Sequence, residues 1–318
     1  MRYFDVFNGD ADGICALHQL RLADPLDSEL VTGLKRDIAL LAGVPAQSGD
    51  VVTVLDLSLD RNRAGLMELL ERGVLVRYFD HHYAGEIPRH PGLEAAIDDS
   101  RAACTSALID RHLGGRFRAW AVVGAFGDNV PEAGAQLAAS LGLEGARLAE
   151  LRELGASLNY NAYGESAADV LVPPVDLYRI VSHYEDPFEM IAREPVVGQL
   201  AAQRRADLDN ALGLAPARSS PAADAYVLPE AAWSRRVIGT FANRLAAGDP
   251  ARAHAVLVPV DGGAYVVSVR APPGAPSAAE FCRRYSTGGG RASAGGIDRL
   301  ESARIDGFIE EFARAWKA

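Results

Sequence analysis

The segment Arg2–Ala23, RYFDVFNGDADGICALHQLRLA, joins a short apolar strand, an acidic loop and a helix with apolar residues at helical spacing. Within it, Asn8, Asp10 and Asp12 stand at alternate positions, and Gly13 follows directly. Oxygen-bearing side chains this close repel one another unless a cation lies between them. A strand that leads into a helix is the start of a βαβ unit, so the segment predicts a parallel sheet with a charged site at its edge.

The same alternation continues through the first two-thirds of the chain. Apolar, β-branched segments predict strands at Val51–Leu59 and Val74–His82, and apolar periodicity predicts helices at 61–73, 102–115 and 117–129. Strands that are apolar nearly throughout are buried on both faces, which is typical of parallel sheets covered by helices. The sequence therefore predicts the α/β class.

The last third of the chain has a different pattern. After a polar-faced helix, the segment 216–224, PARSSPAAD, predicts a loop, and a hairpin is expected around Asp261–Gly263. We therefore expect a parallel-sheet N-terminal domain, a linker helix and loop, and a smaller α/β C-terminal domain, with a cleft between the domains. The expected bounds are 1–195, 196–221 and 222–318.

Composition excludes several classes of protein. The chain has 318 residues, of which 49% are hydrophobic, and this is enough for two buried cores. A net charge of −10 argues against a large sequence-independent grip on duplex DNA. No apolar run approaches the roughly 18 residues of a membrane span, and the N-terminus lacks an apolar signal core. With three scattered cysteines, a reduced cytoplasmic location is expected.

Acids and histidines follow the predicted strands. Asp56 ends the second strand, Asp80, His81 and His82 end the third, and Asp128 follows an apolar helix. The carboxyl ends of parallel strands meet at one edge of a sheet, so these side chains are expected to converge there with Asp10 and Asp12. Asp and His without Cys suit Mn²⁺ or Mg²⁺ better than structural zinc. Two such ions, roughly 3.5–4 Å apart, can activate water and stabilise both oxygens exchanged at phosphorus.

Other interpretations of these residues are weaker. A calcium loop beginning at Asn8 would have Gln19 at its twelfth position, where a bidentate Glu belongs. A haloacid-dehalogenase phosphatase needs a lysine, and neither of the two lysines, Lys35 and Lys317, stands in a suitable segment. Asp56 alone could cap a helix, and each histidine alone could be an ordinary one. The combination in this order favours a shared site.

At this point the sequence resembles a known family. The "FDHH" after a strand, the upstream "DADG", the lone Asp56 and the later "GAFGDN" are similar to the motifs of the DHH phosphoesterases, which include RecJ exonucleases, nano-RNases and cyclic-dinucleotide phosphodiesterases. The "SVR" strand and the run "TGGGRASAGGI" resemble the DHH-associated C-terminal domain. The resemblance covers nearly the whole chain.

The resemblance implies a role for each matching residue. The implied metal ligands, with Asp56 as the bridge between two ions, are Asn8, Asp10, Asp12, Asp56, His81 and Asp128. His82 is the implied proton donor to the leaving oxygen, and Asp80 orients a histidine. The implied contacts to a substrate phosphate, carboxylate or nucleotide are Ser268, Arg270, Gly288, Gly289, Gly290 and Arg291.

Two residues depart from the family pattern. Asn8 stands where many relatives have His or Asp, and a neutral amide oxygen binds a hard cation more weakly than a carboxylate does. Arg291 stands where the glycine loop of relatives continues with His. The first departure predicts one weak metal site, and the second predicts a changed substrate.

Two hypotheses about function follow. The first is a two-metal phosphoesterase that hydrolyses a phosphomonoester or phosphodiester bond of a small nucleotide or short oligonucleotide. The second is a binding or regulatory module with the same fold that has lost turnover, as Asn8 and Arg291 would indicate. Short single-stranded nucleic acid as a partner and a homodimer are both left open. A pyrophosphatase is disfavoured, because relatives of that kind use lysine in the second domain, where this chain has only Lys317.

Overall fold

The computed structural model describes residues 1–100 and 102–316, which form two compact units, Met1–Ala202 and Gln203–Ala318. Each unit is described by itself. The domain bounds expected from the sequence and the expected cleft stay predictions.

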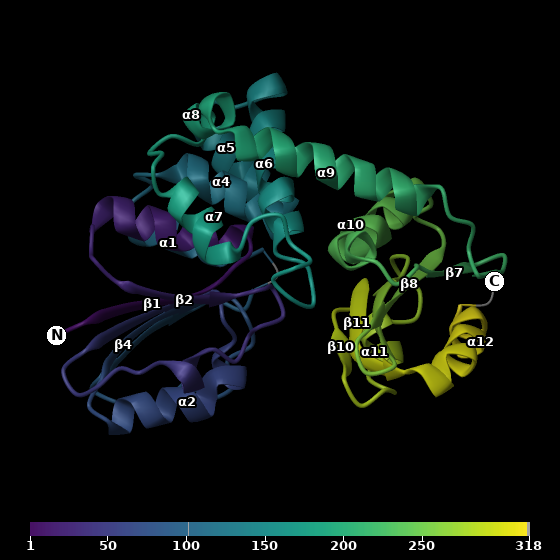
Figure 1. Ribbon diagram of the computed structural model, residues 1–318, viewed down its shortest axis with the longest axis horizontal. Helices are drawn as coiled ribbons and strands as arrows, with labels where there is room; N and C mark the ends of the chain where they lie inside the picture. The colour runs from purple at the N-terminus through teal and green to yellow at the C-terminus, as the bar shows by residue number, and fades with distance from the viewer. Residues whose placement is uncertain (101, 317–318) are drawn as a thin grey trace. The chain divides into compact units, whose positions relative to one another are not determined.

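The first unit is built on a five-stranded sheet in which every neighbouring pair of strands is parallel (Figure 1). This confirms the parallel α/β fold expected from the sequence. The three expected strands lie side by side at its centre, and two further strands that the sequence pattern did not reveal form the edges. The order across the sheet is β2 (Glu29–Gly33), β1 (Tyr3–Asn8), β3 (Val51–Leu55), β4 (Leu75–Asp80) and β5 (Leu93–Ile97).

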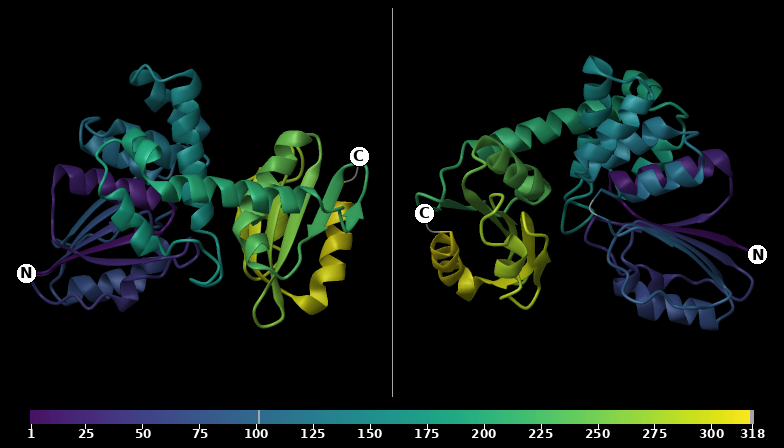
Figure 2. Two further views of the ribbon diagram at one scale, coloured as in Figure 1. Left: turned by 45° about the horizontal axis from the view of Figure 1, so that its top comes forward. Right: turned by 180° about the vertical axis from the view of Figure 1, so that it is seen from behind.

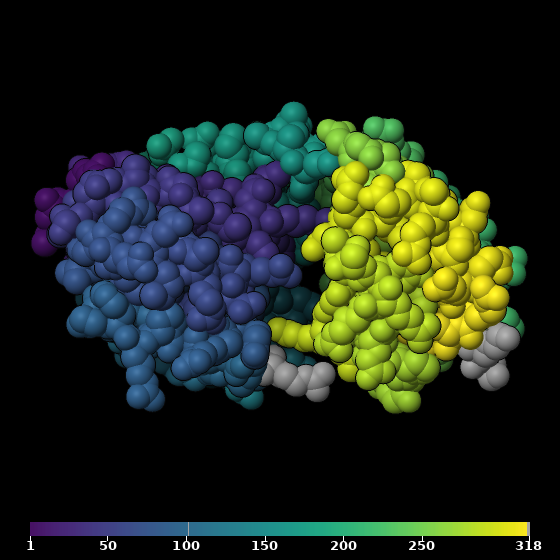
Figure 3. Space-filling model, turned by 90° about the horizontal axis from the view of Figure 1, so that it is seen from below, coloured from purple at the N-terminus to yellow at the C-terminus, as the bar shows by residue number. Residues whose placement is uncertain are grey.

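Helices cover both faces of this sheet (Figures 1 and 2). Phe4 and Val6 of β1 point into one apolar core with α2 (Leu59–Glu71) and the short helix η1 (Leu41–Gly43), whereas Phe7 points into the other. Figure 3, seen from the α2 side, shows this face of the unit as continuous side chains from the early chain, in purple to blue. The helices of the remainder of the unit are α1 (Ala11–Ala23), α3 (Thr105–His112), α4 (Arg118–Gly127), α5 (Pro131–Ser140), α6 (Gly145–Asn161), α7 (Pro174–Val181) and α8 (Pro187–Arg193).

The register of the central strands fixes where the functional residues lie. Phe7 pairs with Leu55, and Leu55 pairs with Phe79. The residues that follow these three, Asn8, Asp56 and Asp80, therefore reach the carboxyl edge of the sheet at the same level.

The second unit contains a mixed six-stranded sheet, as expected for a smaller α/β domain. The hairpin at 261–263 is confirmed, because β8 and β9 pair antiparallel. The strands in order are β10 (Gly288–Gly290), β11 (Ala294–Glu301), β9 (Ala264–Arg270), β8 (Ala253–Val260), β7 (Ala223–Val227) and β6 (Arg218–Ser219). The helices are α10 (Ala232–Gly248), α11 (Ala278–Cys282), the short η2 (Ser302–Arg304) and α12 (Ile305–Ala315), and α9 (Pro195–Leu212) runs across the division between the units.

One local prediction in this region was wrong. The segment 216–224 was expected to be a loop, but Arg218 and Ser219 pair with Ala225 and Asp224 at the edge of the sheet. Pairing with a neighbouring strand here outweighs the turn preference of Pro and Ser.

In the first unit, the predicted helix at 102–115 is shorter than expected, since α3 covers only Thr105–His112.

Candidate metal centre

The backbone at the carboxyl edge is held in an unusual conformation. Asp56 has φ of +59°, in the left-handed region, and its N–H donates to the Phe79 carbonyl at 3.0 Å. The other non-glycine residue with positive φ in the described part of the chain is Asn129, which follows Asp128. A left-handed backbone is costly for most residues, and Asp and Asn tolerate it best. Such conformations concentrate at functional sites, and both of these lie beside expected ligands.

His81 lies at the centre of a group of carboxylates. Its Nε2 is 3.3 Å from Asp56 Oδ1, 3.5 Å from Asp128 Oδ2 and 3.9 Å from Asp12 Oδ2. The residue is 4% exposed, yet among the described residues neither ring nitrogen has a partner in hydrogen-bonding geometry. A buried ring nitrogen close to three carboxylates, without a hydrogen bond to any, is the arrangement expected of ligands around a metal ion.

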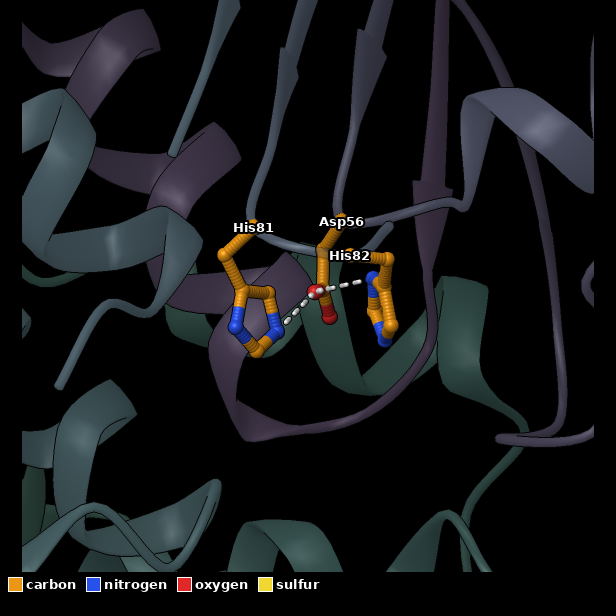
Figure 4. A group of neighbouring side chains, drawn as sticks. All are labelled: Asp56, His81 and His82. Atoms are coloured by element: carbon orange, nitrogen blue, oxygen red, sulfur yellow. Dashed lines mark ion pairs between the residues drawn. The ribbon is translucent and has the colours of Figure 1, made fainter. Parts of the chain in front are cut away.

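Asp56 stands between the two histidines that follow β4 (Figure 4). Its Oδ1 is 3.9 Å from His82 Nδ1 and accepts a hydrogen bond from the Thr105 hydroxyl at 3.2 Å. Burial raises the pKa of Asp56 well above its ordinary value, and the charges of Asp10 and Asp12 raise it further. A cation bound beside Asp56 would offset these effects.

Asp12 is fixed by the start of α3. Its Oδ2 accepts from the Thr105 N–H at 2.7 Å, and its Oδ1 accepts from the Ser106 N–H at 2.8 Å. The side chain is fully buried. Backbone N–H groups at a helix N-terminus hold the Asp12 carboxyl group in place and aimed at the site.

Asp10 has two other partners. It is the N-cap of α1, where its Oδ1 accepts from the backbone N–H of Asp12 at 3.0 Å and of Gly13 at 3.1 Å. Its Oδ2 accepts from the ammonium of Lys35. Burial favours the neutral acid, but the Lys35 charge outweighs it, so the pKa of Asp10 is lowered.

Lys35 is therefore a member of the site, and the sequence argument that placed it outside any suitable segment was wrong. Besides Asp10, its Nζ lies 3.5 Å from Asp128 Oδ1 and donates to Asn159 Oδ1 at 3.1 Å. Lys35 follows the carboxyl end of β2, a strand that the sequence pattern did not reveal. Lys317, the other lysine, lies outside the described residues.

Asp80 and His82 form a pair beside this cluster. His82 Nδ1 lies 2.7 Å from Asp80 Oδ1, and Asp80 is fully buried. Burial lowers the pKa of His82, but the hydrogen bond to Asp80 and the Asp56 charge outweigh it and leave the pKa raised. The His82 side chain is 42% exposed, so it presents a readily protonated imidazole at the surface of the site.

The side chains present fit a divalent cation. Two groups of described residues hold ligand atoms within 4.8 Å of one another, one formed by Asp56, His81 and His82 and the other by Asp12, His81 and Asp128. Burial also raises the pKa of Asp128, and although the charge of Lys35 lowers it, the pKa stays raised. Carboxylate oxygens with one or two imidazoles and no thiolate suit Mn²⁺ or Mg²⁺.

Asn8 lies at the same edge of the sheet, where its side chain accepts a backbone hydrogen bond. It is 5% exposed, and its Oδ1 accepts from the Asp10 N–H at 3.2 Å. Five of the six expected ligands thus lie together. Four of them belong to the two groups with close ligand atoms, and Asp10 lies beside these groups on Lys35. Asn8 has a local backbone contact instead. Thr105, Ser106 and Asn159, which orient the acids and the lysine, carry no sequence motif and were missed.

The expected substrate residues lie in the second unit. Arg270 donates to Ser268 Oγ at 3.0 Å and to Asn243 Oδ1 at 2.7 Å, so its guanidinium is held in place. The three glycines form β10, which pairs with β11 and is not a flexible linker. A Cβ on Gly288 would lie 1.8 Å from the Cys282 carbonyl oxygen, so this glycine is required by packing. Arg291 is exposed at the turn that follows.

Comparison with known proteins supports the fold and leaves the family unassigned from sequence. No family model matches the sequence, and no curated protein matches it. A solved structure of the exonuclease RecJ bound to manganese is 20% identical with a TM-score of 0.65, and the match covers 99% of this chain and 91% of that one.

Two other solved structures are also similar. RecJ of Thermus thermophilus in complex with Mn²⁺ is 20% identical with a TM-score of 0.68, and the match covers 99% of this chain and 52% of that one. The pGpG-specific phosphodiesterase PggH of Vibrio cholerae is 14% identical with a TM-score of 0.53, and the match covers 99% of each chain. The protein therefore has the fold of the DHH phosphoesterases, as its motifs implied.

Proposed function

We propose that this protein is a metal-dependent phosphoesterase that acts on a small nucleotide or a short oligonucleotide. The observation that carries the proposal is the buried His81 Nε2, which lies within 4 Å of three carboxylates without a hydrogen bond to any described residue. The similarity in fold to a RecJ exonuclease bound to manganese and to a pGpG phosphodiesterase supports the same chemistry.

The residues that would hold Mn²⁺ or Mg²⁺ are Asp12, Asp56, His81 and Asp128. A divalent ion bound there supplies Lewis acidity toward a phosphoryl oxygen and toward an attacking water. The backbone donors at the start of α3 keep Asp12 oriented, and the Thr105 hydroxyl does the same for Asp56. Two such ions, with Asp56 between them, were expected from the sequence, and the number of ions is a separate question from the metal dependence proposed here.

His82 is the group that would donate a proton to the leaving oxygen. Asp80 holds Nδ1, which leaves Nε2 as the ring nitrogen that serves the substrate. The raised pKa keeps the imidazole protonated to higher pH than an ordinary histidine, as a general acid requires.

The second unit would supply anion contacts of its own. Ser268 and Asn243 orient the Arg270 guanidinium, whose fork suits a phosphate. Gly289 has open space where a Cβ would be, so its backbone is open to close approach by a nucleotide. Arg291 would supply charge at the same turn, and short single-stranded nucleic acid is included as a substrate.

Activity assays with matched variants test this proposal. The full chain with Mn²⁺ or Mg²⁺ is offered bis-p-nitrophenyl phosphate, pGpG, 3′,5′-bisphosphates, cyclic dinucleotides and short single strands. We expect metal-dependent hydrolysis that His81→Ala abolishes and that His183→Ala, a change to an exposed histidine of the same unit, leaves intact. Metal binding without turnover on the whole panel would instead favour the binding or regulatory module that the sequence left open.

No helix in the described parts of the chain has the length and apolar character to cross a membrane. A cytoplasmic location and a homodimer stay predictions from the sequence, and the oligomeric state is measured directly by light scattering during purification.

A further inference from the structure

The acidic cluster has two halves, one beside Lys35 and one around His81. Lys35 comes two residues after Gly33, which pairs in register with Asn8 at the carboxyl edge of the sheet. Its backbone N–H donates to the Ala162 carbonyl at 2.9 Å, so the start of the side chain is anchored. The lysine therefore reaches the cluster from an ordered segment of the same sheet edge.

The ammonium is surrounded by acceptors. Asp10 Oδ2 and Asn159 Oδ1 accept its hydrogen bonds, and Asp128 Oδ1 lies 3.5 Å away. The ring of Tyr163 lies below the charge, with its centroid 5.7 Å from Nζ. An ammonium has three hydrogens to donate, and this site offers three oxygens for them. The lysine side chain is 24% exposed, so most of its charge interacts with these groups and not with water.

The half of the cluster next to Lys35 is satisfied by the protein itself. Asp10 Oδ1 accepts two backbone hydrogen bonds, and Oδ2 accepts from the lysine. Asn8 Oδ1 accepts from the Asp10 N–H. Asp10 belongs to neither of the two groups of described side chains whose ligand atoms lie close enough to share an ion.

The other half of the cluster is centred on His81. His81 is 4% exposed and has no hydrogen-bond partner among the described residues at either ring nitrogen. Asp56 Oδ1 and Asp128 Oδ2 lie 3.3 and 3.5 Å from its Nε2. Asp128 thus has one oxygen toward the lysine and the other toward His81, as a carboxylate placed between two cations would.

We propose that the Lys35 ammonium takes the place of one of the two metal ions, so that the protein binds a single divalent cation at Asp12, Asp56, His81 and Asp128. This inference rests on the proposed function, since it presupposes that the cluster holds metal. The ammonium would supply positive charge near a phosphoryl oxygen, but it would not supply the Lewis acidity of a second ion.

Metal counting tests the inference without reference to activity. The full chain is stripped with chelator and titrated with Mn²⁺, and bound ions per chain are counted by elemental analysis and by electron paramagnetic resonance. We expect one ion with the six-line signal of isolated Mn²⁺ in the natural protein and in Lys35→Arg. Lys35→Gln, and Lys35→Gln combined with Asn8→Asp, are expected to bind a second ion on the order of tenfold or more tightly than the natural protein does, with a spin-coupled signal.

The outcomes separate this inference from the proposed function. Two coupled ions in the natural protein, or a single ion in both Lys35→Gln proteins with native circular dichroism, would overturn the role of Lys35 and leave a metal-dependent enzyme. No bound Mn²⁺ in any of the proteins would overturn the metal site and the inference together.

Discussion

The substitution Asp56→Asn is expected to make the metal-free protein more stable. Asp56 is 2% exposed, and burial together with the charges of Asp10 and Asp12 raises its pKa well above 3.8. Asparagine has the same shape, tolerates the φ of +59°, and keeps an oxygen that accepts from Thr105. The change therefore removes an ionisable group whose charged form the folded protein disfavours, and little else.

The size of the gain follows from the cost of keeping this carboxyl group neutral. For an acid with an unfolded pKa of 3.8, a raised folded pKa can cost no more than about 4 kcal/mol at pH 7, at 1.36 kcal/mol per pH unit. Because the folded pKa of Asp56 is raised, the natural protein bears no such cost below the unfolded pKa, and it loses stability as the pH rises toward the folded pKa. The advantage of Asp56→Asn should therefore vanish near pH 3.5 and grow toward pH 7.

Urea unfolding measures this gain. Trp120 is the one tryptophan in the sequence of residues 1–202, so its fluorescence reports mainly on the first unit. In chelator at pH 7, Asp56→Asn should unfold at higher urea than the natural protein. With Mn²⁺ at about 100 times its dissociation constant the natural protein should gain about 3 kcal/mol, whereas the variant should gain little. Asp27→Asn, at an exposed position, serves as the control.

Two results would refute this reasoning. If Asp56→Asn were less stable than the natural protein in chelator, the carboxylate would not be short of positive charge. If the variant kept the full stabilisation by Mn²⁺, Asp56 would not be a ligand.

Two further predictions concern the surroundings of the site. Burial lowers the pKa of His18 from 6.5 to about 4. Acidification from pH 7 to pH 4 should therefore cost the natural protein about 3 kcal/mol of unfolding free energy, measured by urea titration. His18→Gln keeps a donor for the Tyr184 carbonyl and should lose less over the same range. A Cβ on Gly124 would lie 2.2 Å from Ser106 Oγ, so Gly124→Ala should lower stability by about 1–3 kcal/mol and weaken Mn²⁺ binding in calorimetry, whereas Gly198→Ala, where a Cβ meets nothing within 4 Å, should do neither.

Local sequence patterns were sufficient to predict the central strands and most of the acids. Asp56, Asp80 and His81 each follow an apolar strand directly, and the level ends of parallel strands bring such positions together. Asp10 marks the limit of this reasoning, because its role as a metal ligand stays a prediction and its contact with Lys35 does not follow from the spacing of the motif. The spacing of a motif identifies neighbours along the chain, but it does not identify a side chain such as Lys35 that comes from a distant segment.

Lys35 could be found only from the folded chain. It follows an edge strand with weak apolar character, and its partners are far from it in sequence, with Asn159 separated by 124 residues. The one signal in the sequence was that the chain uses arginine for nearly all of its basic residues and keeps a lysine here. The lysine ammonium is a compact point charge on a flexible stem.

The most direct measurement of the central claim is anomalous diffraction at the manganese edge from crystals of the full chain grown with Mn²⁺. The account predicts an anomalous peak bonded to His81 Nε2 and to carboxylate oxygens of Asp12, Asp56 and Asp128, with Lys35 still on Asp10. A map without a peak among these side chains, at a Mn²⁺ concentration that supports activity, would contradict it.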